Sequence, residues 1–110
     1  MLPEDRVRIL HMPEAADAVA AFISGRDRPA LDTDQMLLFA LVRAIEIIGE
    51  AASRVSFETQ SAAPAVPWSK ITAMRNRLVH AYFDIDRDIL WKTALDEIPA
   101  LRPLLDEMVS

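Results

Sequence analysis

The segment from Arg75 to Tyr82 carries the residue types that phosphodiester chemistry needs. It reads Arg-Asn-Arg-Leu-Val-His-Ala-Tyr inside an otherwise apolar helical pattern. The guanidinium group of Arg75 suits bidentate binding of a phosphate, and the imidazole of His80 transfers protons near neutral pH. Tyr82 adds an aromatic ring and a hydroxyl group. Together these side chains predict a site that acts on a phosphodiester bond.

Helical spacing bears on how these three groups could meet. Five residues rotate a side chain by about 140° around an ideal helix, whereas seven residues bring it back to within about 20°. On a straight helix Arg75 and Tyr82 would therefore share a face, and His80 would point elsewhere. The groups can meet if the helix loosens near residues 79 to 81, or if two protomers contribute to one cleft at a two-fold interface. The spacing favours this composite site.

The same residues also have a purely structural interpretation. Tyr82 would be a half-buried ring with a solvated hydroxyl group, and His80 would bind a carbonyl group at a helix end. Arg75 would pair with Glu46 or Glu50. On the bare spacing of an arginine and a histidine alone, this structural interpretation is favoured over the catalytic one.

Composition indicates what kind of fold positions the segment. The chain has 110 residues, 52% of them hydrophobic, only two glycines and no sustained strand-like alternation. This favours one all-α domain over residues 1–110 that buries a core and retains apolar surface for a partner. We expect an up-and-down bundle of four main helices plus a short C-terminal helix, and we expect it to form an oligomer.

The first helix is predicted over residues 4 to 24. Its apolar residues recur at near-helical spacing, and Gly25 is a suitable C-terminal cap. Pro13 removes an amide donor and clashes with the carbonyl group four residues earlier. We therefore expect a kink near His11, or two shorter helices.

The second helix is predicted from a capping box at Asp32 and Gln35 to about Phe57. Its residues are apolar around most of the circumference, which indicates burial on more than one side. Its own domain covers one side, and a second protomer would cover another. Residues 58 to 67 are rich in turn-forming types and are expected to form a connecting loop.

Prolines and aspartates mark the remaining helices. Pro67 suits the first turn of a third helix that carries the Arg75 segment. Asp84 or Asp86 is expected to cap a fourth helix, and Pro99 to open a final short helix, kinked or restarted at Pro103.

Charge restricts the partners of this chain. The net charge is −5, which argues against a broad basic surface for nucleic acid. Residues 62 to 82 contain no acidic residue, so Arg75 and Arg77 could form a local positive patch. A narrow polar stripe in the second helix is expected to be a solvated ion-pair face. Its members are Arg43, Glu46 and Glu50.

Several functional classes lack support in the sequence. There is no cysteine, which excludes a disulfide framework, a thiolate zinc site and a cysteine nucleophile. His11 and His80 are far apart in sequence, and the aspartates from 84 to 88 are explained by helix capping, so we predict neither a metal site nor a cofactor. No signal peptide or membrane-spanning run is evident, and we expect a soluble cytoplasmic protein.

Taken together, these motifs resemble a known family. Arg75, four residues, His80, one residue and Tyr82 reproduce the Arg-x4-His-x-Tyr signature of HEPN-domain proteins. The flanking segments, including Pro67-Trp68-Ser69-Lys70-Ile71 and Tyr82-Phe83-Asp84-Ile85-Asp86, are similar to those of the HepT branch, as is Ile47-Ile48-Gly49-Glu50-Ala51-Ala52. The resemblance covers almost the entire chain, and Pro13 in the first helix is a departure from it.

The resemblance implies a function. HepT proteins are toxins of type VII toxin–antitoxin pairs, homodimers that cleave RNA without a metal and are encoded beside an MntA-like nucleotidyltransferase antitoxin. By this resemblance Arg75 and His80 would be the catalytic pair, and Asn76 would support them. Tyr82 would be the residue to which the antitoxin adds AMP. The alternative class is a non-catalytic helical dimer that binds a nucleotidyltransferase or a nucleotide.

Overall fold

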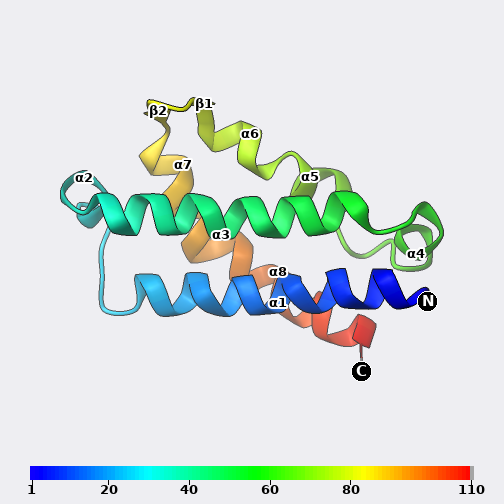
Figure 1. The fold of residues 1–110 in the computed structure, drawn as a ribbon. Coiled ribbons are helices and arrows are strands. Elements are labelled where there is room, and N and C mark those ends of the chain that lie inside the picture. The colour runs from blue at the N-terminus through cyan, green and yellow to red at the C-terminus, as the bar shows by residue number, and fades with distance from the viewer. Residues whose placement is uncertain (110) are drawn as a thin grey trace.

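The structure, a computed structural model, describes residues 1–109 and is built almost entirely of helices (Figure 1). In chain order its helices and strands are α1 (Pro3–Ile23), α2 (Ala30–Thr33), α3 (Gln35–Arg54), α4 (Phe57–Ala62), α5 (Trp68–Thr72), α6 (Met74–Leu78), β1 (Val79–Ala81), β2 (Asp84–Ile85), α7 (Arg87–Lys92), the π-helical η1 (Thr93–Glu97) and α8 (Ile98–Val109). The all-α class expected from the sequence is confirmed, with one small antiparallel ribbon, β1–β2, added to it.

The two longest helices, α1 and α3, form an antiparallel hairpin that organises the rest (Figure 1). Helix α8 packs on α1, and α5 and α6 pack on α3. The two chain ends lie at the same end of the hairpin as α4, whereas the β1–β2 ribbon lies toward the other end, beyond α6 (Figure 1). The segment that carries Arg75 and His80 thus packs on α3, with Leu78 buried in the core and the side chains of Arg75 and His80 exposed.

Helix α3 is the centre of the hydrophobic core. Its inward residues Leu41, Ile45 and Ala52 are fully buried. Gly49 lies where α5 approaches most closely, because a β-carbon at this position would come within 3.3 Å of the carbonyl oxygen of Ile71. The absence of a side chain at Gly49 therefore determines how near α5, and α6 after it, can approach α3.

Helix α1 runs without interruption from Pro3 to Ile23, so the prediction of two shorter helices is wrong. Pro13 lies inside it and is buried. Proline removes one intrahelical hydrogen bond, but packing along α3 and α8 holds the segments on both sides of Pro13 in one helix. The predicted C-terminal cap is confirmed, because Gly25 has a left-handed φ of 70°.

The start of α3 also differs from the prediction. Asp34, and not Asp32, caps this helix: its side chain accepts a hydrogen bond from the amide of Leu37 at 3.1 Å. Asp32 belongs to the short helix α2. The chain leaves α3 at Arg54, earlier than expected, and part of the predicted loop 58–67 is helical, in α4.

Residues 87–109 form one continuous helical stretch from α7 through η1 to α8. Pro99 lies in the first turn of α8, as predicted, but no break separates α8 from the helix before it. A proline ring clashes with the carbonyl group four residues earlier, here that of Leu95, and the wider π-helical turn that contains Leu95 accommodates this clash. Pro103 does not restart the helix.

A buried carboxylate joins the first turn of α1 to the start of α4. Asp5 is only 1% exposed. It accepts hydrogen bonds from the hydroxyl of Ser56 at 2.6 Å, the hydroxyl of Thr59 at 2.7 Å and the amide of Ser56 at 2.9 Å. These bonds, the Ser56 hydroxyl above all, lower the pKa of the Asp5 carboxyl.

We therefore predict that Asp5 makes the protein sensitive to acid. A carboxylate whose pKa is lower in the folded state stabilises the fold above its unfolded pKa of about 3.9, and this stabilisation is lost as the pH falls through the folded pKa. Asp5→Asn should unfold at a lower urea concentration than the parent at pH 7, and the difference should shrink below about pH 4. Asp17→Asn removes a more exposed carboxylate from the same helix and is the control. A difference that persists unchanged at low pH would refute the assignment.

Candidate active site

The helix that carries Arg75 ends before His80. Helix α6 stops at Leu78, and Val79 continues in extended conformation with φ −115° and ψ 105°. The carbonyl group of Leu78 accepts a hydrogen bond from the amide of Asp86 at 2.7 Å, which closes the β1–β2 ribbon. The prediction that Arg75 and Tyr82 share the face of one helix is therefore wrong. The helix does end near residues 79 to 81, which is the condition predicted from the sequence for one protomer to assemble all three groups, but Arg75, His80 and Tyr82 each contact a different partner.

His80 occupies an irregularity of the ribbon. Val79 pairs with Ile85 and Ala81 pairs with Asp84, so the two residues of β1 that flank His80 face consecutive residues of β2. His80 is the extra residue of a β-bulge. Bulges redirect a side chain relative to a regular strand and are frequent beside active sites.

The His80 side chain is 54% exposed and faces one carboxylate. Its Nε2 atom lies 4.0 Å from Oδ2 of Asp86. Asp86 is also the N-cap of α7, because its Oδ1 accepts a hydrogen bond from the amide of Ile89 at 3.0 Å. The predicted capping role of Asp86 is thus confirmed.

Arg75 also faces a carboxylate, on α3. Its Nε atom lies 3.6 Å from Oε1 of Glu46, and its side chain is 49% exposed. Arg43 lies 3.5 Å from both Glu46 and Glu50. The polar stripe of α3 is the ion-pair face that the sequence predicted, and the expected contact between Arg75 and Glu46 is confirmed. This stripe connects α3 directly to the candidate site.

Tyr82 and Phe83 form the tip of the ribbon. Tyr82 is 90% exposed, and the two rings meet edge to face with centroids 5.1 Å apart. The expectation of a half-buried tyrosine is therefore wrong. Asn76 lies on α6 next to Arg75 and is exposed. Within residues 1–109 no hydrogen bond or ion pair joins Arg75 to His80 or Tyr82, so one protomer does not bring the three groups into contact.

Comparison with known proteins assigns the chain to a family. Residues 12–108 match the model of the family described as Ribonuclease HepT-like. The chain belongs to this family. Its membership confirms the resemblance stated from the sequence and the enzyme class, a ribonuclease; metal independence and the residue roles stay predictions.

Individual relatives agree with the family. The chain is similar to the "Probable ribonuclease HepT" of Thermococcus cleftensis, with 39% identity over 75 residues that cover 68% of each chain. It is also similar to proteins named "Putative RNase" from Methanocaldococcus jannaschii and Caldanaerobacter subterraneus. The first is 35% identical over 81% of this chain and 82% of its own, and the second is 41% identical over 69% and 68%. No solved structure matches the chain.

In this HepT-like chain Arg77 has a different role from its neighbour Arg75. It binds both oxygens of Glu97, at 2.9 and 3.3 Å, and so ties α6 to η1. The hydrogen bonds from Arg77 lower the pKa of the Glu97 carboxyl. The two arginines do not form the uncompensated positive patch that the sequence suggested, because Arg77 is paired with Glu97 and Arg75 faces Glu46.

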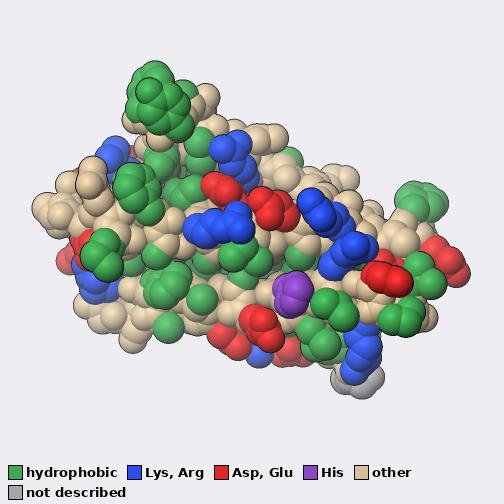
Figure 2. Space-filling model, viewed as in Figure 1, with side chains coloured by type: hydrophobic (Ala, Val, Ile, Leu, Met, Phe, Trp, Pro, Cys, Tyr) green, Lys and Arg blue, Asp and Glu red, His purple; other side chains and the backbone are tan. Residues whose placement is uncertain are grey.

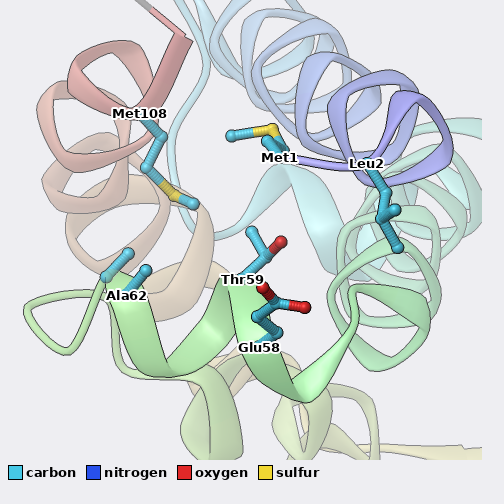
Figure 3. A pocket seen from close by; sticks show the side chains of 7 residues that line it. Met1, Leu2, Glu58, Thr59, Ala62 and Met108 are labelled. Carbon is cyan, nitrogen blue, oxygen red and sulfur yellow. The ribbon is translucent and has the colours of Figure 1, made fainter.

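Several hollows lie elsewhere on the molecule, and two of them are lined in part by residues among the first eleven of the chain. One, of about 430 Å³, opens between the N-terminus, α4 and the end of α8 (Figure 3). Glu58 contributes a carboxylate to its lining, which does not suit a phosphate. The other, of about 520 Å³, is a groove between α1 and α3 with several cations, but Arg43 is held there by Glu50, and Arg8 donates to the carbonyl of Arg54. Neither hollow includes Arg75 or His80.

A metal site was not predicted from the sequence. Within the described part of the chain, no group of three or more histidine, aspartate or glutamate side chains is arranged to hold a metal ion. No helix of residues 1–109 is both long and apolar enough to cross a membrane. The sequence did not predict that Asp86 faces His80, because this contact depends on the bulge in the ribbon.

Proposed function

We propose that this HepT-like chain is the toxin of a type VII toxin–antitoxin pair, a metal-independent RNA endonuclease that uses Arg75 and His80 in a dimer cleft. One observation carries the proposal. In a member of a ribonuclease family, Arg75 and His80 are half exposed, outside the core, on a helix and the bulged strand that follows it directly. This is where a long single strand could reach both groups.

The chemistry needs no group beyond these side chains. The 2′-hydroxyl of RNA attacks the adjacent phosphorus while His80 removes its proton. Arg75 stabilises the charge that develops on the phosphate oxygens. A second imidazole protonates the departing 5′-oxygen, which leaves a 2′,3′-cyclic phosphate on one fragment and a 5′-hydroxyl on the other. Because each protomer has only one histidine in this region, the second imidazole comes from His80 of the other protomer.

Arg75 is available for this role although it faces Glu46. The two atoms are 3.6 Å apart and both side chains contact solvent, and such pairs contribute only about 0–1 kcal/mol. A phosphate offers a stronger bidentate partner and would displace Glu46. Until RNA binds, Glu46 keeps the guanidinium group over α3. Asn76 is exposed beside Arg75 and would support the phosphate as well.

The α1 and α3 hairpin supplies a surface for a homodimer. Large apolar side chains are exposed along it: Val7, Leu10, Phe22, Met36 and Phe39. Figure 2 shows apolar patches across this face, with cationic and anionic side chains between them. Exposed apolar patches of this kind mark interaction sites, and a second copy of the chain would cover this one. The ion pair of Arg75 with Glu46 of α3 supports an active site that would lie at the border of this face.

Regulation would act through Tyr82. Its hydroxyl, on the exposed tip of the ribbon, is accessible to a partner MntA-like nucleotidyltransferase. The tyrosine oxygen would attack the α-phosphate of ATP and release pyrophosphate, so that AMP remains attached. The added phosphate would be anionic and bulky beside the residues that must receive the RNA phosphate, which would inhibit cleavage.

The decisive experiment is RNA cleavage by the purified, unmodified protein with and without EDTA. We expect cleavage in both conditions and products that end in a 2′,3′-cyclic phosphate. Loss of activity in EDTA would contradict the mechanism. If the unmodified parent cuts no RNA, the proposal fails and the alternative, a non-catalytic dimer that binds a nucleotidyltransferase or a nucleotide, is favoured.

The modification is tested separately with the partner transferase and radiolabelled ATP. Tyr82→Phe lacks the acceptor oxygen and should take up no label, while it keeps the ribbon and its aromatic tip. It should also remain active after incubation with the transferase, whereas the parent loses activity. Labelling of the phenylalanine variant to the level of the parent would refute the assignment of Tyr82.

A further inference from the structure

Asp86 faces the His80 imidazole in addition to capping α7. Asp86 divides its two carboxylate oxygens between two partners: Oδ1 accepts from the amide of Ile89 at 3.0 Å, and Oδ2 faces Nε2 of His80 at 4.0 Å. Its own amide donates to the carbonyl of Leu78 at 2.7 Å. A single residue therefore joins the end of α6, the start of α7 and the imidazole.

The position of Asp86 is fixed from several sides. The next residue, Arg87, donates from Nε to the carbonyl of Leu31 at 3.3 Å. Asp88 binds Nε of Arg28 at 2.6 Å, so the first turn of α7 is tied to the segment around α2. An immobilised carboxylate beside a strand that carries a bulged histidine is an arrangement that can hold an imidazole in one orientation.

We propose that Asp86 is a positioning residue for His80: its Oδ2 accepts the Nε2–H of the imidazole, which leaves Nδ1 as the nitrogen that exchanges protons with RNA. This inference rests on the proposed function of His80. The observed 4.0 Å is about 1 Å longer than a hydrogen bond, and catalytic hydrogen bonds often tighten only when substrate binds. The carboxylate would also stabilise the imidazolium that forms when Nδ1 takes the proton of the 2′-hydroxyl.

Asp86→Asn tests the contact with His80 separately from the helix cap, because the substitution preserves the cap. Asparagine caps helices as well as aspartate does, so α7 should be preserved. Its one oxygen would be committed to the amide of Ile89, and its NH2 group would then face Nε2 of His80. A donor at that position favours the tautomer with the proton on Nδ1, which cannot accept the proton of the 2′-hydroxyl.

The control is Asp84→Asn. Asp84 lies on β2 of the same ribbon and is exposed, so the variant removes a carboxylate of the same type without affecting the one that faces His80. If the acids of the ribbon acted only through repulsion of RNA, both variants would cleave at least as well as the parent. A positioning role predicts the opposite sign for Asp86→Asn alone.

The experiment measures kcat and KM on a single-stranded RNA oligonucleotide, and the ring nitrogen shifts of His80 by 15N NMR. For Asp86→Asn we expect kcat to fall at least about tenfold with KM and the melting temperature unchanged, and the NMR signals to report a proton on Nδ1 in place of Nε2. Asp84→Asn should match the parent. An unchanged kcat, or the same tautomer in parent and variant, would overturn the inference. If the parent cuts no RNA, the proposed function fails, and the NMR comparison still decides whether Asp86 orients His80.

Discussion

His80→Ala should lose RNA cleavage almost completely while the protein keeps its fold. Removal of a positioned general acid or base lowers the rate by about 10²- to 10⁴-fold. His80 belongs to a short exposed ribbon outside the core, and surface substitutions of this kind change stability by only about 0.5 kcal/mol. The melting temperature should therefore stay within error of the parent while cleavage of a labelled RNA disappears.

Two companion variants show which property of His80 matters. His80→Asn keeps a polar side chain of similar reach but cannot transfer protons near neutral pH, so it should be as inactive as His80→Ala. Arg102→Ala removes a partly exposed arginine of α8 that pairs with Asp17 and Asp106 and not with the Arg75 segment, and it should remain active. If the asparagine variant kept most of the activity, His80 would not be the acid or base.

The same assay distinguishes the nuclease from the non-catalytic alternative. A protein that only binds a nucleotidyltransferase would cut no RNA, and His80→Ala would change nothing in the assay. Growth of cells that express each variant gives a second readout. If the chain is a toxin, His80→Ala should relieve growth inhibition, while a pull-down with the partner transferase should remain unchanged.

The sequence predicted the helices well because their signals are local. Apolar spacing identified α1 and α3, and Gly25 ended α1 in the left-handed conformation expected of it. Asp86 could be named as one of two helix caps because capping depends on residues only three positions apart. The pairing of Arg75 with α3 joins residues far apart in the sequence, and it could be anticipated only as a choice between Glu46 and Glu50.

The end of α6 could not be predicted, because no local signal marks it. Val79 and the residues after it continue the apolar spacing of a helix, and the ribbon is fixed by the bond from the amide of Asp86 to the carbonyl of Leu78, eight residues away. Asp5 is a similar case, since an acid in the first turn of a helix normally faces water. Its burial depends on Ser56 and Thr59, which lie more than fifty residues later.

These contacts change the explanation of why Arg75 and His80 lie apart in one protomer. Helical phase alone separates His80 from Arg75 by rotation. In the structure a bulge separates them, and each faces its own carboxylate, Asp86 or Glu46. In both arrangements one protomer supplies a single histidine in the Arg75–Tyr82 segment. The case for a site shared between two protomers therefore does not depend on the straight helix from which it was first argued.

A mixed dimer tests this shared site directly. Parent and His80→Ala chains carrying different affinity tags can be co-expressed and the mixed dimer isolated by tandem purification. If both imidazoles act on one phosphodiester, as base and as acid, the mixed dimer lacks one of them in its only cleft. Its activity should then fall about 10²-fold or more, close to that of the doubly substituted dimer. Two independent sites would instead leave half of the parental activity.

Control dimers show whether the affinity tags or the mixing of two chains by themselves lower the activity. A parent dimer carrying the same two tags sets the full activity, and a mixed dimer of parent with Arg102→Ala should equal it. Because a mixed dimer that exchanged subunits would regenerate parental dimers, the activity must be followed over time and extrapolated to the moment of mixing with RNA. An initial rate of one half would mean that each His80 works with groups of its own protomer or in a separate site. An initial rate far below one half requires that the two His80 side chains serve the same bond.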